Sequence, residues 1–501
     1  MDSLRHFPLG SRFPDSPHAV ISSLPTLKDV CGYEEHDPRV LSALKSGYPR
    51  FVTHEYVELL IEFYVKRAGL VGRAVVLVDS RRAVDDALVY LGARACSLQV
   101  DGSVYILYCD ASDVALVKRI KKYVQHTGCS VYSRQAEDLL VKHGLLSGQF
   151  DESVVMDGAL VEVERVLAEQ IGCQVEDVLL CTSGMNAFYA GFRSVQACQR
   201  RRGRTAWVQL GWLYLDSGCV LKEFLSEGET LDYSYDVFDV DAIIEKLRAY
   251  GDSLAAVVVE CPSNPLIRVC EVHRIAAVVR ELGGVMVIDP TIASVFSVDV
   301  LPCADLLITS LTKYAASEGD VMSGALAVNQ SSPFYRELVD TVGHYHVPVY
   351  QRDAQRLAYE LETAPAVVAE MNANASRLCA FFKGHPAVEH IYCAGCSDHI
   401  EEVAKPGRLV GAVISIELKG DMERFYDSIR LMKGPSFGAR FTLLCPFMYL
   451  AHYDLVTSDE GRLFLADVGL DPELIRVSVG AEPYEELEQI FNEALLASIA
   501  C

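Results

Sequence analysis

The sequence predicts an α/β protein whose largest part is a mainly parallel seven-stranded sheet sandwiched by helices. Between about residues 150 and 345, short unbroken runs of Val, Ile and Leu alternate with helical patterns, as in strands buried on both faces. After residue 353 the pattern changes to one long helix through about residue 383 and then to alternating strands such as 413–417. The second pattern predicts a smaller C-terminal α+β domain.

The chain has 501 residues, enough for two or three domains at about 150 residues each. Residues 1–55 are rich in Pro, Ser and His and are expected to form an extended arm. Residues 56–148 predict a small, extra N-terminal α/β unit with strands at 74–78 and 104–108. The large domain is expected at 149–348 and the C-terminal domain at 349–501.

Within the large domain, strands are predicted in chain order at 178–181, 206–210, 255–260, 285–289, 304–309 and 325–328, with helices at 185–200 and 272–281. Strands that follow one another through helices are typical of parallel pairing. Ligands of such sheets bind outside the carboxyl ends of the strands, so the residues that follow each strand are the candidates for a site.

Charge and composition exclude several classes of function. The formal net charge of −23 opposes nucleic-acid binding. No 18-residue apolar span and no signal-peptide core are present, so no membrane partner is expected. The 16 cysteines are scattered through apolar segments, which favours a cytoplasmic chain with reduced thiols. Cys393-Ala-Gly-Cys396 has a redox or half-zinc spacing, but no second such pair follows and His399 alone does not complete a site; no metal is expected.

Two strand ends carry groups suited to a charged ligand. Thr182-Ser-Gly184-Met185 is a strand-to-helix turn that directs backbone N–H groups and the positive end of a helix at an anion, which suits a phosphate. Asp289 ends another strand, where a buried carboxylate can pair with a protonated ring nitrogen. Taken alone, each pattern is more often a helix cap than a ligand site.

Two further strand ends complete the set. Lys313 follows the predicted strand 304–309, with the hydroxyls of Ser310 and Thr312 just before it, and Tyr214 follows the strand 206–210. A lysine after a strand is ordinarily a surface residue, and a tyrosine there is ordinarily part of the core. A phosphate cradle, a carboxylate for a ring nitrogen, a stacking aromatic ring and a lysine at one sheet edge together describe a pyridoxal phosphate site.

The sequence resembles a known family from about residue 125 to its end: the cystathionine γ-synthase-like branch of the Cys/Met-metabolism pyridoxal phosphate enzymes, most closely its fungal members. The matching segments are Tyr132-Ser-Arg134, Glu260-Cys-Pro-Ser-Asn264-Pro, Val287-Ile-Asp289-Pro-Thr291, Ser310-Leu-Thr-Lys313-Tyr314 and Leu474-Ile-Arg476-Val-Ser478-Val-Gly480. The resemblance implies the fold-type I architecture. It also implies a homodimer or homotetramer with active sites at the subunit interface.

The resemblance also implies roles for individual residues. Lys313 carries the cofactor as a Schiff base, Asp289 faces the ring nitrogen, and Tyr214 stacks on the ring and takes part in proton transfer. The remaining cofactor-binding residues are Asn264, Thr291, the phosphate group Ser183, Gly184, Met185, Ser310 and Thr312, and Tyr132 and Arg134 from the partner chain. Arg476, Ser436 and Asn264 bind the substrate, since a guanidinium can hold its α-carboxylate with two hydrogen bonds.

The activity implied is γ-substitution on an O-acyl-L-homoserine through a vinylglycine-type ketimine. The nucleophile is cysteine, giving cystathionine, or a carbon nucleophile such as a β-keto acid or ester. The chain departs from bacterial members at Leu215-Asp216-Ser217, Pro290 and Phe441, so the residues fix neither the nucleophile nor the acyl group. Three alternatives stay open: a γ- or β-lyase, a catalytically decayed relative, and a metal or redox protein built on the cysteines.

Overall fold

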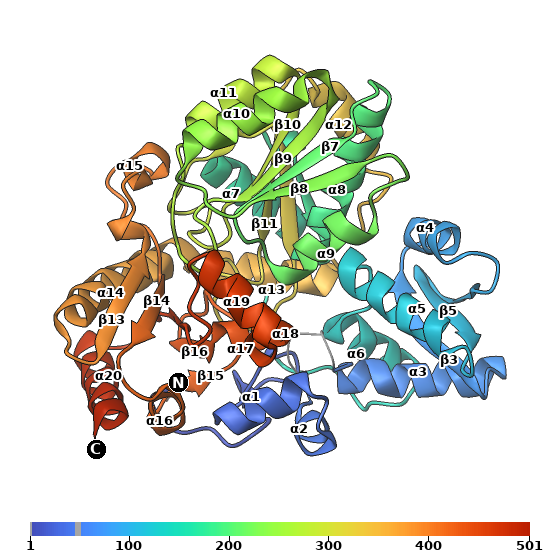
Figure 1. Ribbon diagram of the computed structural model, residues 1–501. Coiled ribbons are helices and arrows are strands. Elements are labelled where there is room, and N and C mark those ends of the chain that lie inside the picture. Colours follow the sequence, from blue (N-terminus) through green and yellow to red (C-terminus); the bar gives the residue numbers. More distant parts are fainter. Residues whose placement is uncertain (1–2, 46–51, 501) are drawn as a thin grey trace.

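The computed structural model describes residues 3–45 and 52–500 and contains four sheets (Figure 1). The large domain is drawn in green and yellow at the top. The C-terminal domain lies below it in orange and red, and the N-terminal unit lies to one side in blue and cyan. Among the described residues, no helix is long and apolar enough to cross a membrane.

The large domain is built on a seven-stranded sheet of order β6-β12-β11-β10-β9-β7-β8. All neighbouring strands pair in parallel except β12, which is antiparallel to both β11 and β6. The bounds are β6 (Val178–Cys181), β7 (Ala206–Leu210), β8 (Thr230–Ser234), β9 (Leu254–Glu260), β10 (Val285–Asp289), β11 (Leu306–Ser310) and β12 (Gly324–Val328). The predicted α/β fold with a mainly parallel sheet is confirmed.

Helices cover both faces of this sheet because each strand points alternate apolar residues to opposite sides. Along β10, Met286 and Ile288 pack with the cluster that contains α7, α10 and α11, whereas Val285 and Val287 pack with the cluster that contains α8 and α9. The helices are α7 (Ala159–Ile171), α8 (Gly184–Arg200), α9 (Leu215–Glu223), α10 (Val240–Tyr250), α11 (Val272–Leu282) and α12 (Tyr335–Val342).

The C-terminal domain begins with two helices where the sequence predicts one. α13 (Gln351–Leu361) ends and α14 (Ala364–Gly384) begins with Pro365 in its first turn, because proline lacks the N–H that a continuous helix needs. A five-stranded sheet of order β13-β14-β17-β16-β15 follows. Its strands are β13 (Val388–Cys393), β14 (Val413–Leu418), β15 (Met432–Lys433), β16 (Leu443–Pro446) and β17 (Ile475–Ser478). The remaining helices are α15 (Ile400–Val403), α16 (Met422–Ser428), α17 (Phe447–Ala451), α18 (Tyr453–Thr457), α19 (Asp459–Asp467) and α20 (Tyr484–Ile499).

The N-terminal unit is a three-stranded antiparallel sheet of order β3-β5-β4, covered by helices. It comprises α3 (Glu55–Ala68), β3 (Arg73–Asp79), α4 (Arg81–Leu91), β4 (Cys96–Asp101), β5 (Val104–Asp110), α5 (Val114–Thr127) and α6 (Ser133–Lys142). Strand β4 was not predicted, because it lies at the sheet edge and is mostly exposed or half-buried. Helix α5 packs on α8 and α9, so the unit shares a core with the large domain.

The first segment is more structured than the expected arm. It contains the short strands β1 (Arg12–Phe13) and β2 (Ile21–Ser22) and the helices α1 (Leu27–Glu34) and α2 (Pro38–Ala43). Val30, Tyr33 and Val40 join the core of the C-terminal domain. Phe7, Phe13 and Ile21 form a separate cluster with residues of β15, β16 and the loop between them. The Pro- and Ser-rich pattern that predicted an extended arm therefore belongs to a segment that packs on the C-terminal domain.

Candidate active site

One cavity of about 680 Å³ lies at the carboxyl edge of the parallel strands, between the large domain, the C-terminal domain and the N-terminal segments. Twelve of the fourteen residues predicted for the site line it: Tyr132, Ser183, Gly184, Met185, Tyr214, Asn264, Asp289, Thr291, Ser310, Thr312, Lys313 and Arg476. Residues separated by up to 344 positions are thus brought together, as expected where strand ends meet at one sheet edge.

Lys313 lies three residues beyond the end of β11 and is 4 % exposed. Its Nζ donates a hydrogen bond to the Ser436 hydroxyl at 2.8 Å. Burial, with a further contribution from the nearby Arg476 charge, holds the pKa of Lys313 well below its ordinary value. The environment therefore favours an uncharged amine, the form that acts as a nucleophile or a base.

Asp289 ends β10 beside Glu260, its partner residue at the end of β9. The backbone N–H and the hydroxyl of Thr291 both donate to Asp289 Oδ1, the former at 2.8 Å, and fix the carboxyl group at the cavity wall. Burial raises the pKa of Asp289 to about 6, although these hydrogen bonds oppose the shift. A protonated ring nitrogen placed against Asp289 would supply the positive charge that stabilises its ionised form.

Glu260 lines the cavity and has no role predicted from the sequence. Its Oε1 accepts a hydrogen bond from the backbone N–H of Tyr214. Burial and the neighbouring charge of Asp289 raise the pKa of Glu260 well above its ordinary value. Two carboxyl groups on adjacent strands cannot both ionise cheaply in a buried site, so the arrangement favours one anion, at Asp289, and one neutral carboxyl, at Glu260.

The amino end of α8 forms a cradle for an anion. Ser183 caps the helix: its hydroxyl accepts a hydrogen bond from Asn186 N–H and donates one to Gly128 O. A Cβ on Gly184 would lie 2.8 Å from the Ser310 Cβ, so only glycine permits this close approach of helix and strand. The free N–H groups of a 17-residue helix therefore face the same cavity edge as the hydroxyl-bearing Ser310 and Thr312.

Arg476 on β17 reaches the cavity from the C-terminal domain. It is 5 % exposed, lies against the rings of Phe437 and Phe447, and donates to Asn264 Oδ1 at 3.1 Å. No carboxylate of the described residues lies within ion-pair distance of its guanidinium. A buried guanidinium of this kind is suited to a carboxylate on a ligand.

These groups fit pyridoxal phosphate. The cradle at α8 suits its phosphate, Asp289 suits its ring nitrogen, and the uncharged Lys313 suits its aldehyde. Arg476 is then left for the carboxylate of an amino acid. Ser436, expected to bind substrate, lies next to the cavity and is hydrogen-bonded through its hydroxyl to Lys313 and through its backbone carbonyl, at 3.5 Å, to Arg476.

Arg134, expected in the phosphate site of a partner chain, does not line the cavity of its own chain. Its side chain is fully buried and its guanidinium lies 2.7 Å from Glu152, 3.0 Å from Asp353 and 3.3 Å from Asp320. These carboxylates, all in the same chain, already satisfy its charge, so Arg134 is not available to a phosphate in this structure. Tyr132, expected from a partner chain, lines the cavity of its own chain.

The arm supplies cavity residues that the sequence did not indicate. His18, Ala19 and Val20 line the cavity, and Val20 N–H donates to the carbonyl of Gly319 in the loop after Lys313. The His18 ring hydrogen-bonds with the Ser133 hydroxyl at 3.1 Å. A single histidine in a turn-rich segment carries no periodic pattern, so the sequence offered no signal for it.

Phe441 and His399, both discussed from the sequence, lie outside the cavity. Phe441 packs on Phe13, with ring centroids 4.3 Å apart, and Arg440 pairs with Glu318. His399 pairs with Glu402 at 2.8 Å and does not join Cys393 and Cys396, whose sulfur atoms are 3.0 Å apart.

The chain is similar to known proteins over most of its length. A profile of the family described as Cys/Met metabolism PLP-dependent enzyme matches residues 147–496. The chain is 34 % identical to the L-2-amino-4-chloropent-4-enoate dechlorinase/desaturase of Streptantibioticus cattleyicolor, over 96 % of this chain and 97 % of that one. It is 26 % identical to the cystathionine gamma-synthase of Neurospora crassa, over 98 % of each chain.

Solved structures show the same fold. The cystathionine gamma synthase of Xanthomonas oryzae pv. oryzae in complex with cystathionine superposes with a TM-score of 0.58 at 22 % identity, covering 70 % of this chain and 88 % of that one. The cystathionine gamma-lyase of Lactobacillus plantarum complexed with L-serine also gives 0.58, at 20 % identity, covering 71 % and 90 %.

Proposed function

The chain belongs to the Cys/Met metabolism family of pyridoxal phosphate-dependent enzymes, and on this premise we propose that it eliminates a leaving group from the γ-carbon of a single L-2-amino acid. The substrate loses its γ-substituent and one proton and gains a carbon–carbon π bond. No second substrate is needed to complete this reaction.

The proposal rests on the number of arginine side chains that line the cavity. Among the described residues that line the cavity, Arg476 is the one arginine, and its partners leave it free to bind one α-carboxylate. A reaction that joins two amino acids brings two α-carboxylates into the site. The lysines lining the cavity are Lys313, which is committed to the cofactor, and Lys121. A single arginine that can bind one α-carboxylate supports elimination from one amino acid over a reaction that joins two amino acids.

The similarity to the dechlorinase/desaturase supports the nature of the leaving group. The relative that is 34 % identical over 96 % of this chain is named for removing chlorine from L-2-amino-4-chloropent-4-enoate, whose chlorine is on C4, the γ-carbon. Met185, Phe437 and Phe447 contribute apolar surface to the cavity of the present chain. An apolar wall suits a halogen or an alkenyl group better than a polar acyl ester. We therefore propose a γ-halogenated, unsaturated amino acid as the substrate class.

In this reaction pyridoxal phosphate supplies an electron sink conjugated to the substrate's α-carbon when it is bound. Asp289, oriented by Thr291, would keep the ring nitrogen protonated. Arg476 would hold the substrate carboxylate and so fix the α-carbon relative to Lys313 Nζ. Lys313 would hold the cofactor through Nζ, and this uncharged amine would also accept the substrate's α-proton, oriented by its hydrogen bond to the Ser436 hydroxyl.

A second candidate is γ-substitution on an O-acyl-L-homoserine by cysteine or by a carbon nucleophile. The similarity to the cystathionine gamma-synthase of Neurospora crassa over nearly the whole chain favours it. The same residues would remove the α-proton and release the γ-substituent. The two candidates differ in whether an added nucleophile is required for release of the final product.

The test is to incubate the purified holoenzyme with L-2-amino-4-chloropent-4-enoate, O-acetyl-L-homoserine or O-succinyl-L-homoserine, each with and without cysteine or a β-keto ester. Chloride release and product mass are the readouts. We expect chloride release that does not depend on an added nucleophile. Products that form only when a nucleophile is present would favour substitution instead.

A control variant ties the activity to the site. Lys313→Ala should lose the visible absorbance of the covalent bond between lysine and cofactor, and its turnover should fall by at least roughly 10²-fold. Full turnover by this variant, or failure of the wild-type protein to bind pyridoxal phosphate at all, would contradict both candidates.

A further inference from the structure

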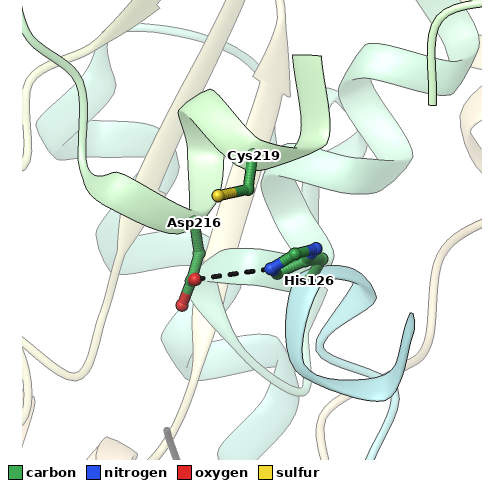
Figure 2. Close-up of side chains that lie close together, drawn as sticks. All are labelled: His126, Asp216 and Cys219. Carbon is green, nitrogen blue, oxygen red and sulfur yellow. Dashed lines mark ion pairs between the residues drawn. The ribbon is translucent and has the colours of Figure 1, made fainter. Parts of the chain in front are cut away.

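Three side chains that commonly bind metals converge at the border of the catalytic cavity (Figure 2). His126 comes from the last turn of α5, and Asp216 and Cys219 come from α9. One ligand atom of each lies within 4.8 Å of the others, and His126 Nε2 lies 3.6 Å from Asp216 Oδ1. Two ligands bound to one tetrahedral zinc ion at about 2.1 Å lie roughly 3.4 Å apart, close to this separation.

The spacing on α9 presents the ligands on one helical face. Asp216 and Cys219 are three residues apart, so they face the same direction, and Glu223 follows one turn later. Since α5 packs directly on α9, His126 is brought opposite this face. His126 is distant in sequence from the other two residues, so no local sequence motif predicts the cluster.

The residues that contact the three proposed ligands are of the kind that surrounds metal ligands in proteins. The second ring nitrogen of His126, Nδ1, lies 3.4 Å from Glu223 Oε2, and Lys122 holds Glu223 at 2.9 Å. A histidine that binds a metal through one nitrogen ordinarily directs the other at a carboxylate. His126 is 3 % exposed, and its Nδ1 makes no hydrogen bond among the described residues.

Two hydrogen bonds also hold the carboxylate of Asp216 in place. Gln125 donates to its Oδ1 at 2.9 Å, and the Tyr214 hydroxyl donates to its Oδ2 at 3.2 Å. These bonds fix the carboxylate with Oδ1 turned toward His126. Asp216 and Glu223 bring two carboxylates to a cluster that Lys122 and Lys222 also face, and a bound cation would offset the repulsion between these carboxylates.

From this geometry we propose that His126, Asp216 and Cys219 bind one zinc-class divalent cation. Imidazole, carboxylate and thiolate ligands together match the preferences of Zn²⁺ better than those of Mg²⁺ or Ca²⁺. Glu223 orients His126 from outside the coordination shell. Through Asp216 the ion would hold the hydroxyl of Tyr214, and so position this ring at the cavity wall without taking part in bond breaking. The inference does not depend on which γ-reaction the enzyme performs.

The experiment uses untagged, full-length holoenzyme, freed of metal by dialysis against a chelator and then supplied with one equivalent of Zn²⁺ or Co²⁺. Metal analysis by mass spectrometry is expected to recover about one ion per chain. Bound Co²⁺ should show the near-ultraviolet charge-transfer band of a cobalt–thiolate bond. Added Zn²⁺ should also raise the melting temperature.

Matched variants locate the ion. Cys219→Ser and His126→Asn should each weaken metal binding by at least roughly tenfold, and Cys219→Ser should abolish the thiolate band. Cys396→Ser, which removes a thiol that lies 3.0 Å from Cys393 and is not part of the proposed site, should keep both signals. Cys219 is half-buried, so its serine variant tests the proposal even where His126→Asn does not fold.

Two results would overturn the proposal. One is a wild-type protein that retains no more metal than Cys219→Ser, which would leave His126 as a polar neighbour of Asp216 and Glu223 without a metal. The other is loss of metal in Cys396→Ser but not in Cys219→Ser, which would assign the ion to Cys393 and Cys396. Because both variants carry the same cofactor, metal bound by pyridoxal phosphate itself cancels in the comparison.

Discussion

Lys313 and Arg476 are two buried cationic side chains in one cavity, and the fixed charge of one shapes the chemistry of the other. The guanidinium cannot lose its proton, so the amine is the group that becomes uncharged. The carboxyl groups behave in the same way: the pair on β9 and β10 favours one anion, at Asp289, with Glu260 neutral. At the residue scale, the site consists of pairs in which only one member carries charge.

The raised pKa of Asp289 predicts a pH effect on the cofactor-free protein. Its folded-state pKa of about 6 exceeds its ordinary value of 3.8, so the stability it contributes is complete below about pH 4 and is lost as pH rises through about 6. Asp289→Asn should therefore lose less stability than the wild type across this range, by about 1–3 kcal/mol. Thermal unfolding at a series of pH values measures this. The exposed Asp241→Asn should reproduce the wild-type profile, and parallel profiles for Asp289→Asn and wild type would contradict the assignment.

The clamp at Arg476 makes a second prediction at this scale. Lysine keeps the charge but not the two parallel N–H donors, so Arg476→Lys should raise the KM for the amino acid by roughly 10–100-fold, the equivalent of about 1.5–3 kcal/mol. Cofactor absorbance should be unchanged. Arg440→Lys is the matched control, since this guanidinium pairs with Glu318 outside the cavity and its KM should stay at the wild-type value. An unchanged KM in Arg476→Lys would show that the carboxylate binds elsewhere.

At the scale of elements, α6 is tied to the rest of the chain by charge. Arg134 in its first turn contacts Glu152, in the segment before α7, together with Asp320 after Lys313 and Asp353 in α13. Arg356, also in α13, shares Asp320. The network joins three segments behind the lysine loop, so it positions the wall of the cavity without contacting a ligand.

Removing Arg134 should therefore destabilise the fold. Arg134→Met leaves three buried carboxylates without their central cation, which should cost about 3–5 kcal/mol of unfolding free energy, measured by denaturant titration. Arg165→Met removes an exposed helical ion pair and should have little effect. A stable Arg134→Met protein with weakened cofactor binding would instead support a direct role at the phosphate, as the family resemblance implies.

The elements also show what sequence patterns can and cannot predict. The strands of the large sheet were predictable because they are buried on both faces and have continuous apolar runs; β6, β7 and β10 have the predicted bounds. Strand β8 was missed because it lies at the sheet edge, where its residues are exposed or half-buried. At the site, Lys313 and Asp289 follow such strands and were found, whereas the partners of Arg134 come from three distant segments that no local pattern connects.

At the scale of the whole molecule, the cavity is closed by both ends of the chain. The arm supplies Ala19 and Val20, and the C-terminal domain supplies Arg476. The arm is held by Phe13, which packs between Phe7 and Phe441 with ring centroids 5.2 Å and 4.3 Å away. The two ends meet because the arm lies across the loop between β15 and β16, beside the sheet that carries Arg476.

Loosening this anchor should open the cavity. Phe13→Ala should cost about 3 kcal/mol of local stability, since the ring is buried among other apolar groups. We expect faster hydrogen exchange in residues 12–22 and weaker substrate binding, measured by mass spectrometry and by KM. Phe238→Ala, at a partly exposed position outside this cluster, should change neither. Unchanged exchange in the arm of Phe13→Ala would show that it is anchored by other contacts.

The position of Arg476 in the sequence also determines when, during synthesis, the active site can assemble. During translation the chain acquires Asp289, Lys313 and the α8 cradle before β17, the strand that carries Arg476. The arm precedes the C-terminal sheet in the chain and can pack on it only once that sheet has been synthesised. The cofactor site therefore reaches its final geometry only after β17 has been made.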